Sequence, residues 1–203
     1  MLGGMSSEYP RITMVSPDIA GVRGEYLGYQ YLIFCAEIPD ARAFYDAVSS
    51  LEEEGSWIQY VPCDLVAGLR CLEVSIRLGI RDFARGRSIA RKLNLQILLR
   101  LFARTQVKEV LEIIGRSGRS KCFVIVVSKR DPEDVLVYLR RLCEPEAHIS
   151  SCIARGRAIK LAQMYGISWD IIESIANAKG IGTSDALEMF VIERIATLGL
   201  FKS

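Results

Sequence analysis

The chain has 203 residues, half of them hydrophobic, which is enough apolar material for one domain with a core of its own. Its six cysteines are scattered and include no C-x-x-C pair, so zinc-knuckle and thioredoxin-like sites lack their ligand spacing, and we expect buried free thiols. No apolar run reaches the roughly 18 residues of a membrane span, and no signal-like segment begins the chain. The sequence therefore predicts a cytoplasmic protein.

The net charge of +2 conceals a strong asymmetry along the chain. Between residues 70 and 130 there are fifteen basic residues against four acidic ones, an excess of eleven. Such an excess predicts a field that binds polyanions. The alternative interpretation of the same charges is a set of solvated helix faces that bind no ligand.

The first third of the chain predicts a strand, a helix and a second strand after a flexible lead-in at residues 1–10. An aromatic and β-branched run at 26–38 is typical of a strand, and WIQYV at 57–61 of another. Between them, Pro39 and Asp40 begin a helix with one apolar face. That face consists of Phe44, Val48 and Leu51.

After Pro62 the hydrophobic period becomes that of a helix, and the basic stretch is predicted to be a group of short helices. The first has Asp64 as its cap, and a turn of helix follows it through Arg91. Two more helices are predicted to begin at caps formed by Asn94 and Thr105, the second ending at Gly115. The apolar stripe of the first helix is Leu65, Leu69, Leu72, Ile76, Ile80 and Phe83.

The apolar run CFVIVV at 122–127 predicts a central strand covered on both faces, and Asp131 with Pro132 predicts the next helix start. Further helices are predicted at 151–165, at 168–178 and at 184–198, the last two capped by Ser168 and Ser184. The predicted fold is α/β of the α+β kind, with a small mixed or antiparallel sheet, several short helices and a helical C-terminal part. We expect an α/β core at 11–148, including the basic segment, and a helical extension at 149–203 packed on it.

Catalytic motifs do not emerge from the sequence. The single histidine, His148, follows Pro145 in a predicted loop, and no nucleophile elbow accompanies it. The glycines at 21–28 lack the spacing of a dinucleotide site, and there is no phosphate-binding loop of the G-x-x-x-x-G-K-[ST] type. The glutamates at 52–54 are typical of a solvated helix end. The sequence therefore predicts a protein that is not an enzyme and uses neither a metal nor a cofactor.

An ordered series of segments resembles a known family. The series is DLVAGLRCLEVSI from residue 64, NLQILLRLFARTQVKEVLEIIG from residue 94, CFVIVVS from residue 122, then the Asp-Pro helix and the helical tail. It is similar to the tRNA-recruiting, kinase-binding subunit of the KEOPS complex, the family of the PRPK-binding protein, in its archaeal type. The likeness runs from AGVRG near residue 20 to the end. Its sharpest element is R-T-Q-[VI]-x-E-x-x-x-I-I-G at 104–115.

The resemblance implies a non-catalytic subunit with two partners. One is the small atypical kinase/ATPase of KEOPS, and the other is the 3′ CCA end of tRNA. The complex installs threonylcarbamoyladenosine beside the anticodon, with chemistry performed by another subunit. Many family members carry a histidine where this chain has Cys71, so a role that depends on that imidazole is not expected here.

The junction between the two short helices is the predicted RNA-binding site. A single-stranded 3′ end can be held by stacking, base-edge hydrogen bonds and phosphate contacts. Arginine stacks and forks onto phosphate, glutamine pairs with a base edge, lysine supplies a point charge, and the helix start offers free N–H groups. The alternative for each side chain is surface solubility or, for the threonine, helix capping alone. The predicted residues are Arg100, Arg104, Thr105, Gln106 and Lys108.

Two other classes of function remain open at this point. Several short basic helices can also form a helix-turn-helix-like DNA-binding regulator, which would prefer duplex DNA and form a symmetric dimer. A small-molecule enzyme would require a pocket with clustered titratable groups.

Overall fold

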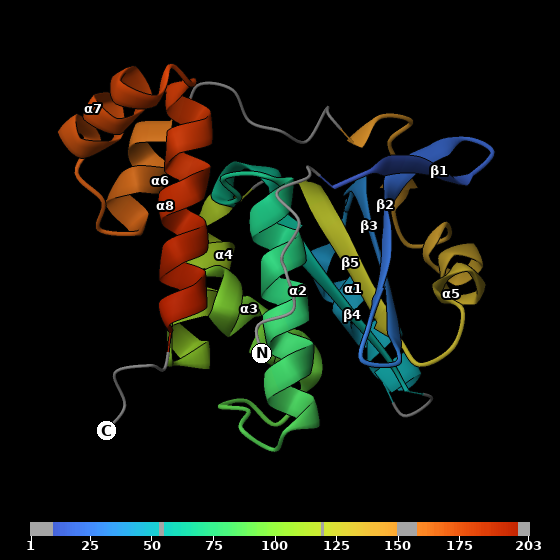
Figure 1. The fold of residues 1–203 in the computed structure, drawn as a ribbon. Helices are drawn as coiled ribbons and strands as arrows, with labels where there is room; N and C mark the ends of the chain where they lie inside the picture. Colours follow the sequence, from blue (N-terminus) through green and yellow to red (C-terminus); the bar gives the residue numbers. More distant parts are fainter. Residues whose placement is uncertain (1–9, 53–54, 119, 150–157, 199–203) are drawn as a thin grey trace.

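The computed structural model describes residues 10–52, 55–118, 120–149 and 158–198, and it contains one antiparallel sheet (Figure 1). The strand order is β1-β2-β3-β5-β4, and β6 pairs with the end of β3. This confirms the predicted fold class and selects the antiparallel alternative over the mixed one. The strands are β1 (Ile12–Ser16), β2 (Ile19–Tyr26), β3 (Tyr29–Glu37), β4 (Ser56–Pro62), β5 (Lys121–Ser128) and β6 (Glu144–Pro145).

The helices cover both faces of this sheet. Trp57 of β4 contacts Phe83, and Tyr31 of β3 donates a hydrogen bond to Glu73, so α2 covers one face. Tyr60 of β4 lies on the opposite face and packs edge-on against Phe44 of α1. The helices are α1 (Ala41–Val48), α2 (Leu69–Ala84), α3 (Leu93–Leu101), α4 (Val107–Ser117), α5 (Pro132–Leu139), α6 (Ala158–Met164), α7 (Trp169–Lys179) and α8 (Thr183–Thr197).

The predicted central strand is confirmed. β5 lies between β3 and β4, and seven of its eight residues are buried. The run predicted as one strand at 26–38 is divided, because Leu27 and Gly28 both have positive φ and form a two-residue turn between β2 and β3. Asp40 caps α1 and Asp131 caps α5, each through its side chain, as predicted.

Several other predicted helix starts are wrong. Asp64 lies in a short 3-10 turn, Cys63–Leu65, where it accepts a hydrogen bond from Ser117, and α2 begins after Gly68. Asn94 lies inside α3 and is buried, donating to the carbonyl of Ile58. α8 begins after Gly182 rather than at Ser184. Residues 85–92 form a loop and not the predicted turn of helix.

The C-terminal helices pack on the rest of the chain through α8. α8 contacts α2 and α3, and Figure 1 shows it running alongside α2. The buried face of α8 includes the predicted stripe residues Leu187, Val191 and Ile195. The predicted lead-in at residues 1–10 and the start of the helix predicted at 151–165 lie largely outside the described residues.

The cysteines of the described segments divide into two groups, and Cys152 lies outside those segments. Cys71, Cys122 and Cys143 are buried free thiols, as predicted. Cys35 and Cys63 are disulfide-bonded, so the prediction of free thiols is wrong for these two. None of the helices in the described segments is long and apolar enough to span a bilayer.

Candidate functional site

The predicted junction connects the end of α3 to the start of α4. Ala103 has a positive φ and ends α3, and the chain then turns outward. Thr105, Gln106 and Lys108 are all exposed. Gln106, and not Thr105, is the N-cap residue of α4, and no side-chain hydrogen bond caps this helix. The first-turn N–H groups of α4 and the Gln106 amide therefore lie together at an exposed corner.

Arg100 lies in the interior, on the side of α3 that faces α2 and α8. Its side chain is only 9% exposed, and its Nε donates to Asp82 Oδ2 at 2.6 Å. One Nη donates to the main-chain carbonyls of Leu198 at 2.6 Å and Ile195 at 3.3 Å. Arg100 thus neutralises a buried carboxylate and caps the end of α8, and in this conformation it is closed to RNA.

Arg104 is also engaged by the protein, although its side chain is 29% exposed. Its guanidinium donates to the carbonyl of Met164 at the end of α6 and lies 2.6 Å from a carboxylate oxygen of Glu109. Because the Arg104 and Glu109 charges offset each other, the net positive charge of the junction comes mainly from Lys108. Of the five predicted residues, the structure brings Thr105, Gln106 and Lys108 together on the surface, whereas the two arginines support helix ends.

Glu188 of α8 is a polar residue that sequence reasoning missed. Its carboxylate is buried and accepts a hydrogen bond from the backbone N–H of Arg70 at 2.9 Å, so it caps α2 from another helix. Burial raises the pKa of Glu188, although the hydrogen bond from Arg70 opposes the shift. The N-cap residue of α2 is Gly68, where a Cβ would lie only 2.1 Å from this carboxylate. The one signal in the sequence is that Glu188 directly follows Leu187 in the predicted apolar stripe of α8, where an acid is unexpected.

Cys71 lies beside this cap. It is fully buried, and its thiol is 3.8 Å from the main-chain carbonyl of Glu188. Burial raises the pKa of the Cys71 thiol, which keeps it protonated at neutral pH. Cys71 is therefore a small buried group between α2 and α8.

The remaining sequence candidates are the single histidine and possible metal ligands. His148 is exposed in a loop, and within the described segments no three histidine, cysteine or carboxylate side chains meet as metal ligands. A pocket of about 260 Å³ between Ile38, Tyr60 and Ile114 is smaller than typical ligand sites.

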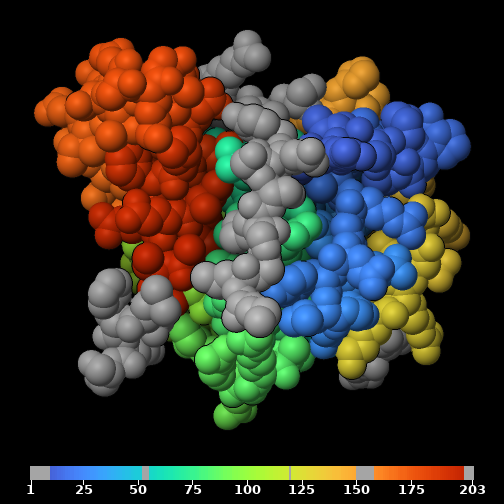
Figure 2. All heavy atoms as spheres, viewed as in Figure 1, coloured from blue at the N-terminus to red at the C-terminus, as the bar shows by residue number. Residues whose placement is uncertain are grey.

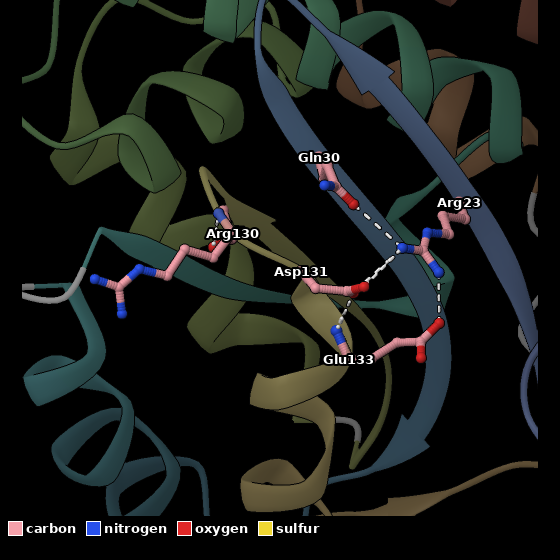
Figure 3. Close-up of polar contacts among 6 residues, drawn as sticks. Arg23, Gln30, Arg130, Asp131 and Glu133 are labelled. Carbon is pink, nitrogen blue, oxygen red and sulfur yellow. Dashed lines mark hydrogen bonds and ion pairs between the residues drawn. The ribbon is translucent and has the colours of Figure 1, made fainter.

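A surface ion-pair cluster joins β2 to the start of α5. Arg23 Nη2 lies 3.1 Å from Asp131 Oδ2, and its Nη1 lies 2.5 Å from Glu133 Oε1 (Figure 3). Nη2 also donates a hydrogen bond to Gln30 Oε1 at 3.2 Å. Arg130 points away from this cluster in the same view. Because Asp131 also caps α5, the cluster is sufficiently explained by holding that helix against the sheet.

Replacement of Arg100 should destabilise the fold. We expect Arg100→Met to cost about 3–5 kcal/mol of unfolding free energy, because it leaves the buried Asp82 carboxylate without its cation. Adding Asp82→Leu should recover part of that loss, since the uncompensated charge is removed. Urea denaturation measures both, with Lys108→Met as an exposed control that should change stability by less than about 0.5 kcal/mol. Equal stability of Arg100→Met and the control would contradict this role.

The Glu188 cap predicts a specific pH dependence. Because the folded-state pKa is raised, ionised Glu188 opposes folding above that pKa, and the wild type gains stability relative to Glu188→Gln as pH falls through it toward 4.5. Glu188→Gln keeps an acceptor for Arg70, so we expect it to be at least as stable as wild type at pH 7. Thermal unfolding of both proteins between pH 4 and pH 7, with Glu188→Ala as the variant that loses the cap, measures the difference. A wild-type advantage that grows with rising pH would have the wrong sign.

The sequence was compared with known families and with curated proteins. No known family model matches the sequence, and no curated protein is similar enough to count as a match.

Proposed function

We propose that this chain is a non-catalytic subunit of the KEOPS complex that binds the 3′ CCA end of tRNA and docks on the small atypical kinase/ATPase. Two features support this: the ordered series of segments that resembles the KEOPS subunit, and the chemistry of the exposed junction between α3 and α4. The observation that carries it is the uncapped, exposed start of α4, where Thr105, Gln106 and Lys108 lie together. In this role the chain supports threonylcarbamoyladenosine formation by presenting tRNA to the subunit that performs the chemistry.

The junction has the groups that a single-stranded 3′ end needs. The Gln106 amide is free to pair with a base edge, and Lys108 with the first-turn N–H groups can hold a phosphate. Arg104 positions this corner by joining it to the end of α6 and to Glu109. Arg104 therefore orients the RNA-binding corner. Arg100 stabilises the packing of α3 against α2 and α8.

The kinase partner is proposed to bind a mainly apolar helical face. Such a face needs large apolar side chains that the isolated subunit leaves exposed. α6, α7 and α8 each have one, namely Ile159, Ile171 and Met189, with 53%, 51% and 39% exposure. These residues support a docking surface among the C-terminal helices.

The helix-turn-helix alternative is weaker. A recognition helix must present its side chains to a DNA groove. Eight of the nine residues of α3 are buried, and α4 carries two basic and two acidic residues. Neither helix offers the exposed basic face that duplex DNA requires, so we do not propose this function.

The tRNA half of the proposal predicts dependence on the 3′ end. tRNA that lacks its terminal CCA should bind at least about tenfold more weakly than intact tRNA, since it loses base-edge and phosphate contacts together. Gln106→Ala should reduce the difference between the two RNAs, whereas Lys108→Ala should mainly lower the salt slope by roughly one unit. Filter binding at fixed salt measures this, and Lys160→Ala is the exposed control on α6. Equal affinity for intact and CCA-less tRNA would remove the 3′-end assignment.

The kinase half predicts a direct complex. Isothermal titration of the purified chain with a small KEOPS kinase should show binding at micromolar concentrations or below. Ile171→Glu on α7 should weaken it because it places a charge in an apolar contact, whereas Lys179→Glu on the same helix serves as a surface control. A flat titration with both proteins folded would contradict this half.

A further inference from the structure

A concentration of exposed positive charge lies away from the predicted junction. The loop at residues 85–92, with sequence RGRSIARK, contains four basic residues and no acid. Arg85, Arg87 and Arg91 are exposed, and no described residue forms a side-chain hydrogen bond or ion pair with them. Figure 1 shows the loop at the bottom of the molecule between α2 and α3, and Figure 2 shows it protruding there. We call residues 85–92 the basic loop.

Hydrogen bonds to the main chain of the basic loop fix its conformation. The side-chain oxygen of Gln96 accepts hydrogen bonds from the N–H groups of Ile89 at 2.9 Å and Ala90 at 3.1 Å. The N–H of Arg87 donates to the carbonyl of Asp82, and Gly86 takes the positive φ that the turn requires. The arginine main chain is thus ordered before any ligand binds, which lowers the entropy cost of binding.

An apolar row of rings adjoins the basic loop. Phe83, two residues before the loop, contacts Trp57 at 5.9 Å between ring centroids, and Trp57 contacts Tyr29 at 6.0 Å. Phe83 and Trp57 are partly exposed. The ammonium of Lys129 lies 5.5 Å from the Tyr29 ring at the far end of the row. Tyr29 itself is buried, so the accessible rings are Phe83 and Trp57, and rings of this kind near a basic loop can stack with nucleic-acid bases.

We infer that the basic loop is a second RNA-contact surface, which binds phosphates of the RNA whose 3′ end lies at the junction; the inference rests on the proposed function. The loop and the junction lie at opposite ends of α3, whose nine residues span about 13 Å at 1.5 Å per residue. A stacked strand places one phosphate every 3.4 Å, so the loop meets RNA about four or more nucleotides from the 3′ end. A membrane surface fits less well, because Ile89 is the loop's only large aliphatic side chain.

Salt-dependent binding tests this assignment. The loop variant Arg85→Ala/Arg87→Ala/Arg91→Ala is compared with Arg42→Ala/Lys160→Ala/Lys179→Ala, which removes the same charge from exposed positions on α1, α6 and α7. Fluorescence anisotropy with labelled tRNA should show a slope of log affinity against log salt that is smaller by about two in the loop variant, as expected for roughly three lost phosphate contacts. Affinity at about 0.1 M salt should fall at least about tenfold, and the control should change by no more than about twofold.

A second readout reports contact directly. The chain has two tryptophans, so Trp169→Phe leaves Trp57 as the single reporter beside the loop. tRNA should quench or shift the Trp57 emission in that protein, and removing the three loop arginines should abolish the change at the same RNA concentration.

The loop surface and the 3′-end site can fail separately. Removing the loop arginines should weaken the binding of intact tRNA and of CCA-less tRNA by the same factor, because the loop contacts are separate from the CCA contacts. Equal weakening by the loop and control variants would overturn the inference. It would also be overturned if the loop variant kept its affinity for tRNA but lost binding to vesicles that contain phosphatidylserine.

Discussion

The buried pair of Asp82 and Arg100 connects three helices, α2, α3 and α8. Asp82 belongs to α2, Arg100 to α3, and the carbonyls that Arg100 caps belong to the end of α8. Asp82 also accepts a hydrogen bond from Gln96, which in turn holds the basic loop. A buried charge tolerates little displacement of its partner, so this one contact restricts the positions of three helices and a loop at once.

Helix ends in this protein are often completed by residues from other helices. Glu188 of α8 caps the start of α2, Arg100 of α3 caps the end of α8, and Arg104 caps the end of α6. Each bond satisfies backbone groups that a local cap would otherwise have to serve. The C-terminal helices are therefore joined to the core by directional polar contacts as well as by the apolar stripe of α8.

Because some arginines of the basic stretch bind groups of the protein itself, not all of its positive charge is available to a ligand. An excess of eleven positive charges between residues 70 and 130 describes the chain, but Arg100 is inside the protein and Arg104 is paired with Glu109. Among the described residues, Arg85, Arg87 and Arg91 of the basic loop are exposed and available to a polyanion, and Lys108 contributes at the junction. The proposed function therefore separates recognition of a 3′ end by polar groups from attraction of the phosphate backbone by arginines.

Local pattern alone determined the α+β class, the central strand at 122–127, and the helix starts at Asp40 and Asp131, because these depend on hydrophobic period and on caps close in sequence. Closeness in sequence was also enough to predict that Thr105, Gln106 and Lys108 lie together. Only the tertiary structure decided that Arg100 is buried, since its partner Asp82 is eighteen residues away and no periodicity marks an ion pair. The start of α2 was decided in the same way, by a carboxylate 118 residues distant. Contacts of this kind are invisible in a single sequence because they arise when helices pack.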